Sequence, residues 1–204
     1  MKEFNIVLAG VGGQGILLAA EILGTAALKQ GLNVRVSEIH GMAQRGGSVT
    51  SNIRMGEKVL APTVLEENAN VLLGFEPLET VRNLKYTSEK TLTLINNEPI
   101  PPPGLTTKMM SYPSLDEIIK KIRGFTKNIV VVDAAKLAEE AGSVLTRNVV
   151  LIGGLVATGK MPVKIETLKE GIRELVPANY LEMNMKAFEL GYEYVQKKAK
   201  LEVF

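Results

Sequence analysis

Residues 4–15, with the sequence FNIVLAGVGGQG, decide the fold that we expect for this chain. Phe4 to Ala9 is a short apolar run that ends at glycine, which predicts a buried parallel strand. Ile16 to Leu28 is an almost wholly apolar helix pattern, and Gly31 is the expected left-handed residue at its end. Asn33 to Ile39 reads as a second strand. The beginning of the chain therefore predicts a strand–helix–strand unit with a glycine turn at its centre.

Strands and helices continue to alternate along the chain, which predicts an α/β fold. Residues 48–55 alternate, with Thr50, Asn52 and Arg54 on a polar face, and predict a half-buried strand. Apolar runs predict further strands at 71–75, 91–95 and 128–132. Helices are predicted at 76–84, 115–122, 134–141, 146–158, 165–175 and about 181–200, with the start of a strand as the alternative within 146–158. The proline-rich stretch 98–113 predicts a stiff loop, and we expect residues 1–204 to form a single domain.

Composition excludes several classes of function. The 204 residues include no cysteine, which excludes disulfides, thiolate catalysis and cysteine-ligated iron–sulfur or zinc sites. The single histidine, His40, excludes a histidine-rich metal site, and we predict neither a metal ligand nor a catalytic residue on this chain. The 24 basic and 22 acidic residues nearly cancel and aromatics are 5%, so no nucleic-acid partner is expected. Without a long apolar segment or a signal peptide, we expect a cytoplasmic protein with no membrane partner.

The first glycine-rich loop is a candidate anion site. Gly10, Gly12 and Gly15 match G-x-G-x-x-G between a strand and a helix. In that pattern the glycines allow a tight turn, the approach of a pyrophosphate and close helix–strand packing. The candidate binding residues are Gly10, Val11, Gly12, Gly13, Gln14 and Gly15. The alternative is a turn that only lets the helix pack on the sheet. Glu38, 23 positions after Gly15, is a candidate ribose ligand or an exposed strand-end carboxylate.

The second glycine-rich loop, residues 41–47, adds a cation. Arg45 has a planar fork suited to phosphate or carboxylate, and the candidate binding residues here are Gln44, Arg45, Gly46 and Gly47. The alternative is a flexible turn with a solvated arginine. Both loops follow strand-like runs, so we expect them at one edge of one sheet, facing one ligand. We do not expect His40 to act as a base, and we expect Asp133 to cap the helix that follows it.

Three stretches together resemble a known family. These are Gly10 to Gly15, then Ser37 to Val49 with its Gln-Arg-Gly-Gly sequence, then Ile53 to Gly56. With Asn148 and the following apolar stretch, they are similar to the gamma module of the 2-oxoacid:ferredoxin oxidoreductases. Within that family the resemblance is to the beta subunit of the indolepyruvate branch, and it spans roughly residues 3–190.

The resemblance implies a Rossmann-like, open and mostly parallel sheet with helices on both faces. It also implies a reaction, the oxidative decarboxylation of an aryl 2-oxoacid to acyl-CoA with reduction of ferredoxin. In that branch thiamine diphosphate, magnesium and [4Fe-4S] clusters belong to a large alpha subunit, which would be the partner of this chain. The absence of cysteine and of a Gly-Asp-Gly thiamine motif agrees with a non-thiamine subunit.

The sequence allows three functions for the sheet edge that carries the two glycine-rich loops. One hypothesis is that it helps to bind coenzyme A, with backbone N–H groups of Gly12, Gly13 and Gln14 and the charge of Arg45. A second is that it is only an assembly surface for the alpha subunit. A third is a free-standing NAD-binding dehydrogenase, although no hydride-transfer acid–base set is recognisable.

Overall fold

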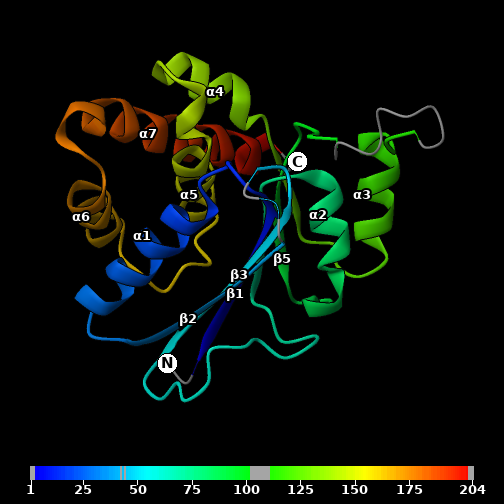
Figure 1. The fold of residues 1–204 in the computed structure, drawn as a ribbon, viewed down its shortest axis with the longest axis horizontal. Helices are drawn as coiled ribbons and strands as arrows, with labels where there is room; N and C mark the ends of the chain where they lie inside the picture. Colours follow the sequence, from blue (N-terminus) through cyan, green and yellow to red (C-terminus); the bar gives the residue numbers. More distant parts are fainter. Residues whose placement is uncertain (1–2, 42, 44, 102–110, 202–204) are drawn as a thin grey trace.

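The structure, a computed structural model, describes residues 3–41, 43, 45–101 and 111–201. Gln44 and most of the proline-rich stretch lie outside these residues. The described part contains a six-stranded sheet in the order β2-β3-β1-β4-β5-β6, in which only β3 runs against its neighbours (Figure 1). The strands are β1 (Phe4–Val11), β2 (Asn33–His40), β3 (Ser48–Gly56), β4 (Val71–Gly74), β5 (Leu92–Asn96) and β6 (Ile129–Val132).

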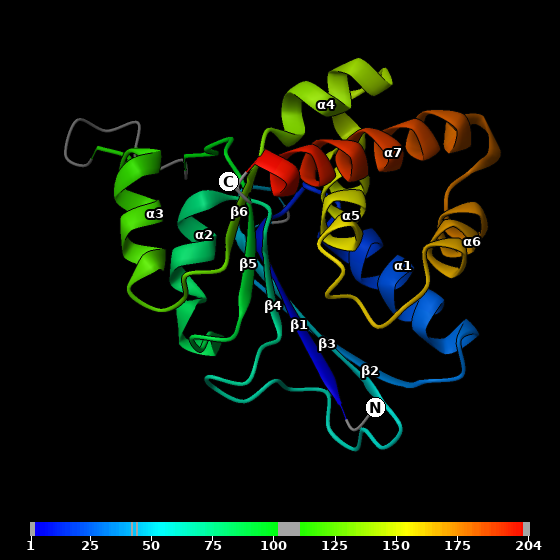
Figure 2. The same cartoon turned by 180° about the vertical axis from the view of Figure 1, so that it is seen from behind.

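Helices cover both faces of the sheet, as the sequence predicts (Figures 1 and 2). One face carries α1 (Ile16–Lys29), α4 (Ala134–Ala141), α5 (Arg147–Ala157), α6 (Ile165–Leu175) and α7 (Ala178–Leu201). The other carries α2 (Pro77–Arg82) and α3 (Leu115–Arg123), with short 3-10 turns η1 (Leu84–Tyr86) and η3 (Val144–Thr146) elsewhere in the chain. The last helix thus begins three residues before the predicted start at 181, whereas the helix over 165–175 is confirmed to the residue.

The strands divide their side chains between two cores. Along β1, Ile6 and Leu8 belong to the larger cluster under α1, α5 and α7, whereas Val7 and Ala9 belong to the smaller one under α2 and α3. Because successive side chains of a strand point to opposite faces, a strand covered on both sides is typically apolar on both. The apolar run from Ile6 to Ala9 has this physical cause.

The predicted half-buried character of residues 48–55 is wrong. β3 is an interior strand between β1 and β2, and its polar residues Thr50 and Asn52 are 9% and 0% exposed. The Thr50 hydroxyl bonds to the side chain of Asn83, just after α2, and Arg54 donates to the carbonyls of Ala61 and Thr63. The alternation is therefore real, but the polar face is covered by the chain that follows α2 and β3 rather than by water.

The topology brings the ends of β1 and β2 together. β3 pairs antiparallel with both strands, so β1 and β2 run in the same direction with β3 between them. Gly10 of β1 and His40 of β2 are both opposite Val49 of β3. The two glycine-rich loops consequently leave the sheet at the same edge, which is the edge where ligands bind in open α/β sheets.

Two glycines let α5 and α7 touch backbone to backbone. A Cβ atom on Gly153 of α5 would lie 2.1 Å from the carbonyl oxygen of Phe188, and one on Gly191 of α7 would lie 2.0 Å from the carbonyl oxygen of Val150. Only hydrogen fits at such positions. The start of α5, which carries Arg147 and Asn148, is therefore held firmly by the long final helix.

Candidate functional site

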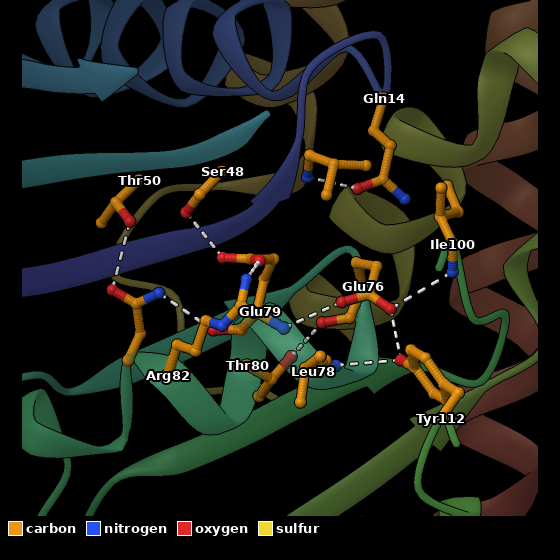
Figure 3. Close-up of polar contacts among 12 residues, drawn as sticks. Gln14, Ser48, Thr50, Glu76, Leu78, Glu79, Thr80, Arg82, Ile100 and Tyr112 are labelled. Carbon is orange, nitrogen blue, oxygen red and sulfur yellow. Dashed lines mark hydrogen bonds and ion pairs between the residues drawn. The ribbon is translucent and has the colours of Figure 1, made fainter. Parts of the chain in front are cut away.

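The first glycine-rich loop is braced by its own glutamine. The Val11 N–H donates to the side-chain oxygen of Gln14 (2.9 Å), and the Gln14 amide donates to the carbonyl of Phe75 at the end of β4 (2.8 Å). A Cβ on Gly10 would lie 2.7 Å from the Cβ of Phe75. Figure 3 shows Gln14 reaching down from the loop. The predicted ligand residue Gln14 thus has a clear internal role, which joins the loop to the neighbouring strand.

The end of this loop is fixed by a residue far away in the sequence. Gly15 has a φ of 72° and forms the N-cap of α1, and the Asn148 side chain donates to its carbonyl (3.2 Å). A Cβ on Gly15 would lie 2.7 Å from that Asn148 amide nitrogen. Gly15 therefore meets two demands, a left-handed backbone and a close neighbour. Asn148 belongs to the last of the motifs on which the family resemblance is based. Its contact with Gly15 gives a structural reason for an asparagine at this position.

The second loop is hydrogen-bonded to the first. The Gly12 N–H donates to the Gly47 carbonyl (2.8 Å), and the Gly46 N–H donates back to the Gly12 carbonyl (3.1 Å). A Cβ on Gly47 would lie 2.6 Å from the carbonyl oxygen of Ala43, so this contact needs glycine. The structure thus brings the two loops together as the sequence predicts.

This pairing changes which backbone groups face a ligand. The Gly12 N–H is bonded to Gly47 and the Gln14 N–H to the Val11 carbonyl (3.3 Å), so both are already used within the chain. The N–H of Gly13 has no partner among the described residues. Gly13 is exposed, has a φ of 98° and has open space where a Cβ would stand. Of the three amides suggested from the sequence, Gly13 is the one that the geometry leaves available.

A pocket of about 430 Å³ opens where the loops meet the carboxyl end of the sheet. We call it the edge pocket. Its lining combines both loops with the ends of β4 and β5 and the start of α5, and comprises Val11, Gly12, Gly13, Gln14, Arg45, Gly46, Phe75, Asn96, Ile100, Val144, Leu145, Arg147 and Leu151. Volumes of this order are typical of small-molecule sites.

Two arginines face the edge pocket. Arg45 is exposed and makes no ion pair within the described residues. Arg147, which the sequence analysis missed, is held in place because its guanidinium donates to Glu98 (2.7 Å) and to the carbonyl of Val144 (2.7 Å). The sequence contains one indication of its role, because Arg147 directly precedes Asn148, a residue of the family motif. Of these two cations, Arg147 is oriented by a carboxylate, whereas Arg45 has no ion-pair partner in the described part of the chain.

A buried carboxylate positions the far wall of the edge pocket. Glu76 is 1% exposed, and it accepts hydrogen bonds from the Ile100 N–H (3.2 Å), the Glu79 N–H (2.8 Å) and the Tyr112 hydroxyl (Figure 3). Burial, together with the hydrogen bond to Glu76, raises the pKa of Tyr112 well above its ordinary value. Tyr112 therefore stays protonated and keeps donating to the carboxylate at neutral pH. This arrangement fixes Ile100 and the chain beside it.

A second pocket, of about 530 Å³, lies on the other side of the first loop. It is lined by the start of α1 and the end of β2, including Leu17 and His40. Glu38, the candidate ribose ligand, is exposed on β2 and is separated from β1 by the whole of β3. In a dinucleotide site that acid would be on the strand beside the glycine loop. The NAD-binding alternative is therefore disfavoured by the strand order.

Comparison with known proteins agrees with this architecture. The family model of pyruvate ferredoxin/flavodoxin oxidoreductases matches residues 5–194. This chain belongs to that family. The indolepyruvate oxidoreductase subunit IorB of Pyrococcus horikoshii is 48% identical over 202 residues, which cover 98% of this chain and 100% of that protein. The resemblance seen in the sequence motifs is thereby confirmed.

Solved structures share the fold. The pyruvate oxidoreductase subunit PORC from Thermotoga maritima is 27% identical, with a TM-score of 0.70 over 95% of this chain and 97% of that one. The 2-oxoglutarate:ferredoxin oxidoreductase from Magnetococcus marinus, solved with 2-oxoglutarate, coenzyme A and succinyl-CoA bound, is 18% identical with a TM-score of 0.72. It matches 97% of this chain but only 32% of its own, so the same fold also occurs as one part of a longer chain.

No described helix combines the length and the apolar character that a bilayer crossing requires. Within the described residues, no group of three or more His, Cys, Asp and Glu side chains is arranged to hold a metal ion.

Proposed function

We propose that this chain is the small, non-thiamine subunit of an indolepyruvate-type 2-oxoacid:ferredoxin oxidoreductase. The observation that carries the proposal is the full-length similarity to an indolepyruvate oxidoreductase subunit, in a chain whose two glycine-rich loops are hydrogen-bonded at the ligand edge of the sheet. In the overall reaction an aryl 2-oxoacid loses its carboxylate as CO₂ and the acyl carbon bonds to the sulfur of coenzyme A. The two electrons released reduce two molecules of ferredoxin.

The residues of this chain fit a division of labour with a large alpha subunit. Iron–sulfur clusters need cysteine thiolates, and the chain has none. Thiamine diphosphate supplies carbanion stabilisation when bound, but the chain lacks the Gly-Asp-Gly sequence that would hold its magnesium. Both groups are therefore assigned to the partner subunit, and ferredoxin reacts with the assembled complex. What this chain contributes is a pocket with donors for an anion.

We further propose that the edge pocket binds coenzyme A in the complex. Coenzyme A carries a diphosphate and a separate phosphate. The pocket offers the Gly13 N–H and the Arg45 guanidinium, neither of which is bonded to another described residue. Arg147, oriented by Glu98, adds a second cation to the lining of the pocket. The other binding residues predicted from the sequence belong to the same proposed site. Gly12 and Gln14 contribute by fixing the shape of the first loop, because their polar groups bond within the chain.

Calorimetric titration of the assembled complex with coenzyme A tests this role. Replacing Arg45 with alanine removes a charged contact of about 1.5–3 kcal/mol, which corresponds to roughly 10- to 150-fold weaker binding. Arg35→Ala is the matched control, because Arg35 is an exposed arginine on β2 that does not line the pocket. Equal affinity of the Arg45 variant and the wild type would remove Arg45 from the site.

One observation favours a second role, in assembly. Leu145 at the rim of the edge pocket is 79% exposed, and Leu17 beside the second pocket is 45% exposed. A contiguous group of exposed apolar side chains is typical of a surface that a partner covers, and Val144, which is 37% exposed, adjoins Leu145 at this rim. Size-exclusion chromatography of the mixed subunits separates the roles. A Leu145→Ser variant that no longer assembles supports docking at this edge, whereas an Arg45→Ala complex that assembles but loses coenzyme A affinity supports the ligand role.

A further inference from the structure

Among the described residues, no strand pairs with the outer side of β6, the last strand of the sheet. The carbonyls of Asn128 and Val132 accept hydrogen bonds from the N–H groups of Thr93 in β5 and of Asn97 just after it (2.8 and 3.0 Å). Because backbone groups alternate along a strand, those of Ile129 and Val131 point away from β5. The Val131 N–H and the Ile129 carbonyl have no partner in the described part of the chain. The strand therefore presents one donor and one acceptor at the spacing that an added strand would use.

A pocket of about 450 Å³ runs along this open edge. It lies between α3 on one side of β6 and α7 on the other, and Figure 2 shows both helices flanking the strand. Apolar side chains of Ile129, Val131 and Val195 are part of its lining. It shares no residue with the edge pocket or with the pocket beside α1. It is thus a separate feature of the molecule.

The charged residues of this pocket are all cations. Arg123, Lys127, Lys160 and Lys198 line it, and its lining contains no carboxylate. None of the four forms an ion pair within the described residues, although seven other basic side chains do. Four unneutralised cations around one cavity repel one another, so an anionic occupant is favoured there.

Lysines beside an edge strand can also serve only to prevent unwanted pairing. Lys198 fits this description, because its ammonium group donates to the Val131 carbonyl (2.9 Å) and lies 4.8 Å from the ring centre of Tyr194. Arg123, Lys127 and Lys160 differ from it, since they are exposed and their side chains make no hydrogen bond with the rest of the described chain. Lys198 alone accounts for protection of the β6 edge against unwanted pairing. Protection therefore does not explain why Arg123, Lys127 and Lys160 also line this pocket.

We propose that the β6 edge receives an extended, acidic segment of the large partner subunit. The segment pairs with the Val131 N–H and the Ile129 carbonyl as an added strand, and its carboxylates lie among Arg123, Lys127 and Lys160. Main-chain hydrogen bonds supply affinity in this mode of recognition, and side chains supply specificity. The inference rests on the proposed function, because the occupant belongs to the partner that the proposed function requires.

The test measures the affinity of this chain for its purified partner subunit over a range of salt concentrations. The double variant Lys127→Glu/Lys160→Glu is expected to bind at least tenfold more weakly and with a shallower salt dependence. Lys127→Arg/Lys160→Arg keeps the charge and is expected to bind like the wild type. Lys58→Glu/Lys186→Glu makes the same change in net charge at exposed lysines outside this pocket and is the matched control.

Hydrogen–deuterium exchange gives a second readout that does not depend on substitutions. The Val131 amide is expected to exchange readily in the free chain and to become protected when the partner binds. Unchanged exchange there, or equal affinity of the charge-reversed and control variants, would overturn the inference while leaving the proposed function intact. Self-association of the free Lys127→Glu/Lys160→Glu chain with unaltered partner binding would also overturn it, by showing that these cations only shield the edge. Failure of the wild-type chain to bind any such partner would instead refute the proposed function.

Discussion

The two glycine-rich loops adjoin each other but are built in opposite ways. In the first loop, residues 10–15, close neighbours leave no room for a side chain at Gly10 and Gly15, and the side chain of Gln14 is hydrogen-bonded to Val11 and Phe75. In the second loop, Arg45 is exposed and pairs with no described residue. The first loop therefore joins β1, β4 and α1 through its internal contacts, whereas the second loop presents a positive charge to solvent. Similar glycine content does not imply a similar role, because the neighbours of each glycine decide what it permits.

The largest effect is expected from substitutions at Gly13 and Gly15, two glycines of the first loop that share a left-handed backbone. Gly15→Ala combines that strain with a contact 2.7 Å from Asn148 and is expected to lower the free energy of unfolding by about 2–4 kcal/mol. Gly13→Ala has the same kind of backbone but open space, and is expected to cost only about 1–2 kcal/mol. Urea unfolding of both variants measures the difference. Equal losses would mean that Asn148 does not restrict the loop.

The glutamine brace gives the next largest effect. Gln14→Ala removes hydrogen bonds to Val11 and Phe75 and is expected to cost about 1–3 kcal/mol. Gln30→Ala is a matched control, since Gln30 also makes two backbone contacts, to Pro162 and Lys164. Both variants should lose similar stability in urea unfolding, but only Gln14→Ala should also weaken coenzyme A binding to the complex. A Gln14 variant with unchanged ligand affinity would show that the brace does not shape the edge pocket.

The Tyr112–Glu76 contact should give a smaller effect that depends on pH. The pKa of Tyr112 is raised above its unfolded value of about 10, so the stability that this contact adds is fully present below pH 10. That stability is lost as the pH rises beyond 10 toward the folded pKa. Tyr112→Phe is therefore expected to be less stable than the wild type by about 1–2 kcal/mol at pH 7, with the gap narrowing above pH 10. Unfolding curves at pH 7, 9 and 10.5 test this, and a gap that stays constant would contradict it.

Arg45→Ala should have the smallest effect on stability. Exposed side chains without partners usually change the free energy of unfolding by less than about 0.5 kcal/mol when they are replaced. The same variant is expected to lose coenzyme A affinity in the complex, so its two effects separate binding from folding. A fall of more than 1 kcal/mol in the free energy of unfolding, measured in urea, would show that Arg45 stabilises the fold instead.

Much of the fold could be predicted from the sequence because its signals are local. Apolar runs predict the strands, and the local pattern Ser114-x-x-Glu117 forms a capping box with both of its hydrogen bonds at the start of α3. Asp133 caps α4 as expected, and Gly31 takes the left-handed conformation. These features depend on a few neighbouring residues, so they can be recognised without knowing the tertiary structure.

The missed features all depend on contacts between distant residues. The burial of β3 follows from the strands and turns that surround it, which alternation alone does not reveal. The contact of Asn148 with Gly15 spans 133 positions, and the role of Arg147 depends on Glu98 at the end of another strand. The use of the Gly12 N–H by Gly47 likewise appears only when the two loops are placed together.

The glycine crossing of α5 and α7 has a mechanical consequence. Since the two backbones touch at Gly153 and Gly191, neither helix can slide or roll without displacing the other. Arg147 and Asn148 at the start of α5 are thereby coupled to a helix whose far end reaches the β6 edge. Because Arg147 lines the edge pocket and Lys198 of α7 contacts β6, we expect a displacement of α7 at that edge to move one wall of the pocket as well.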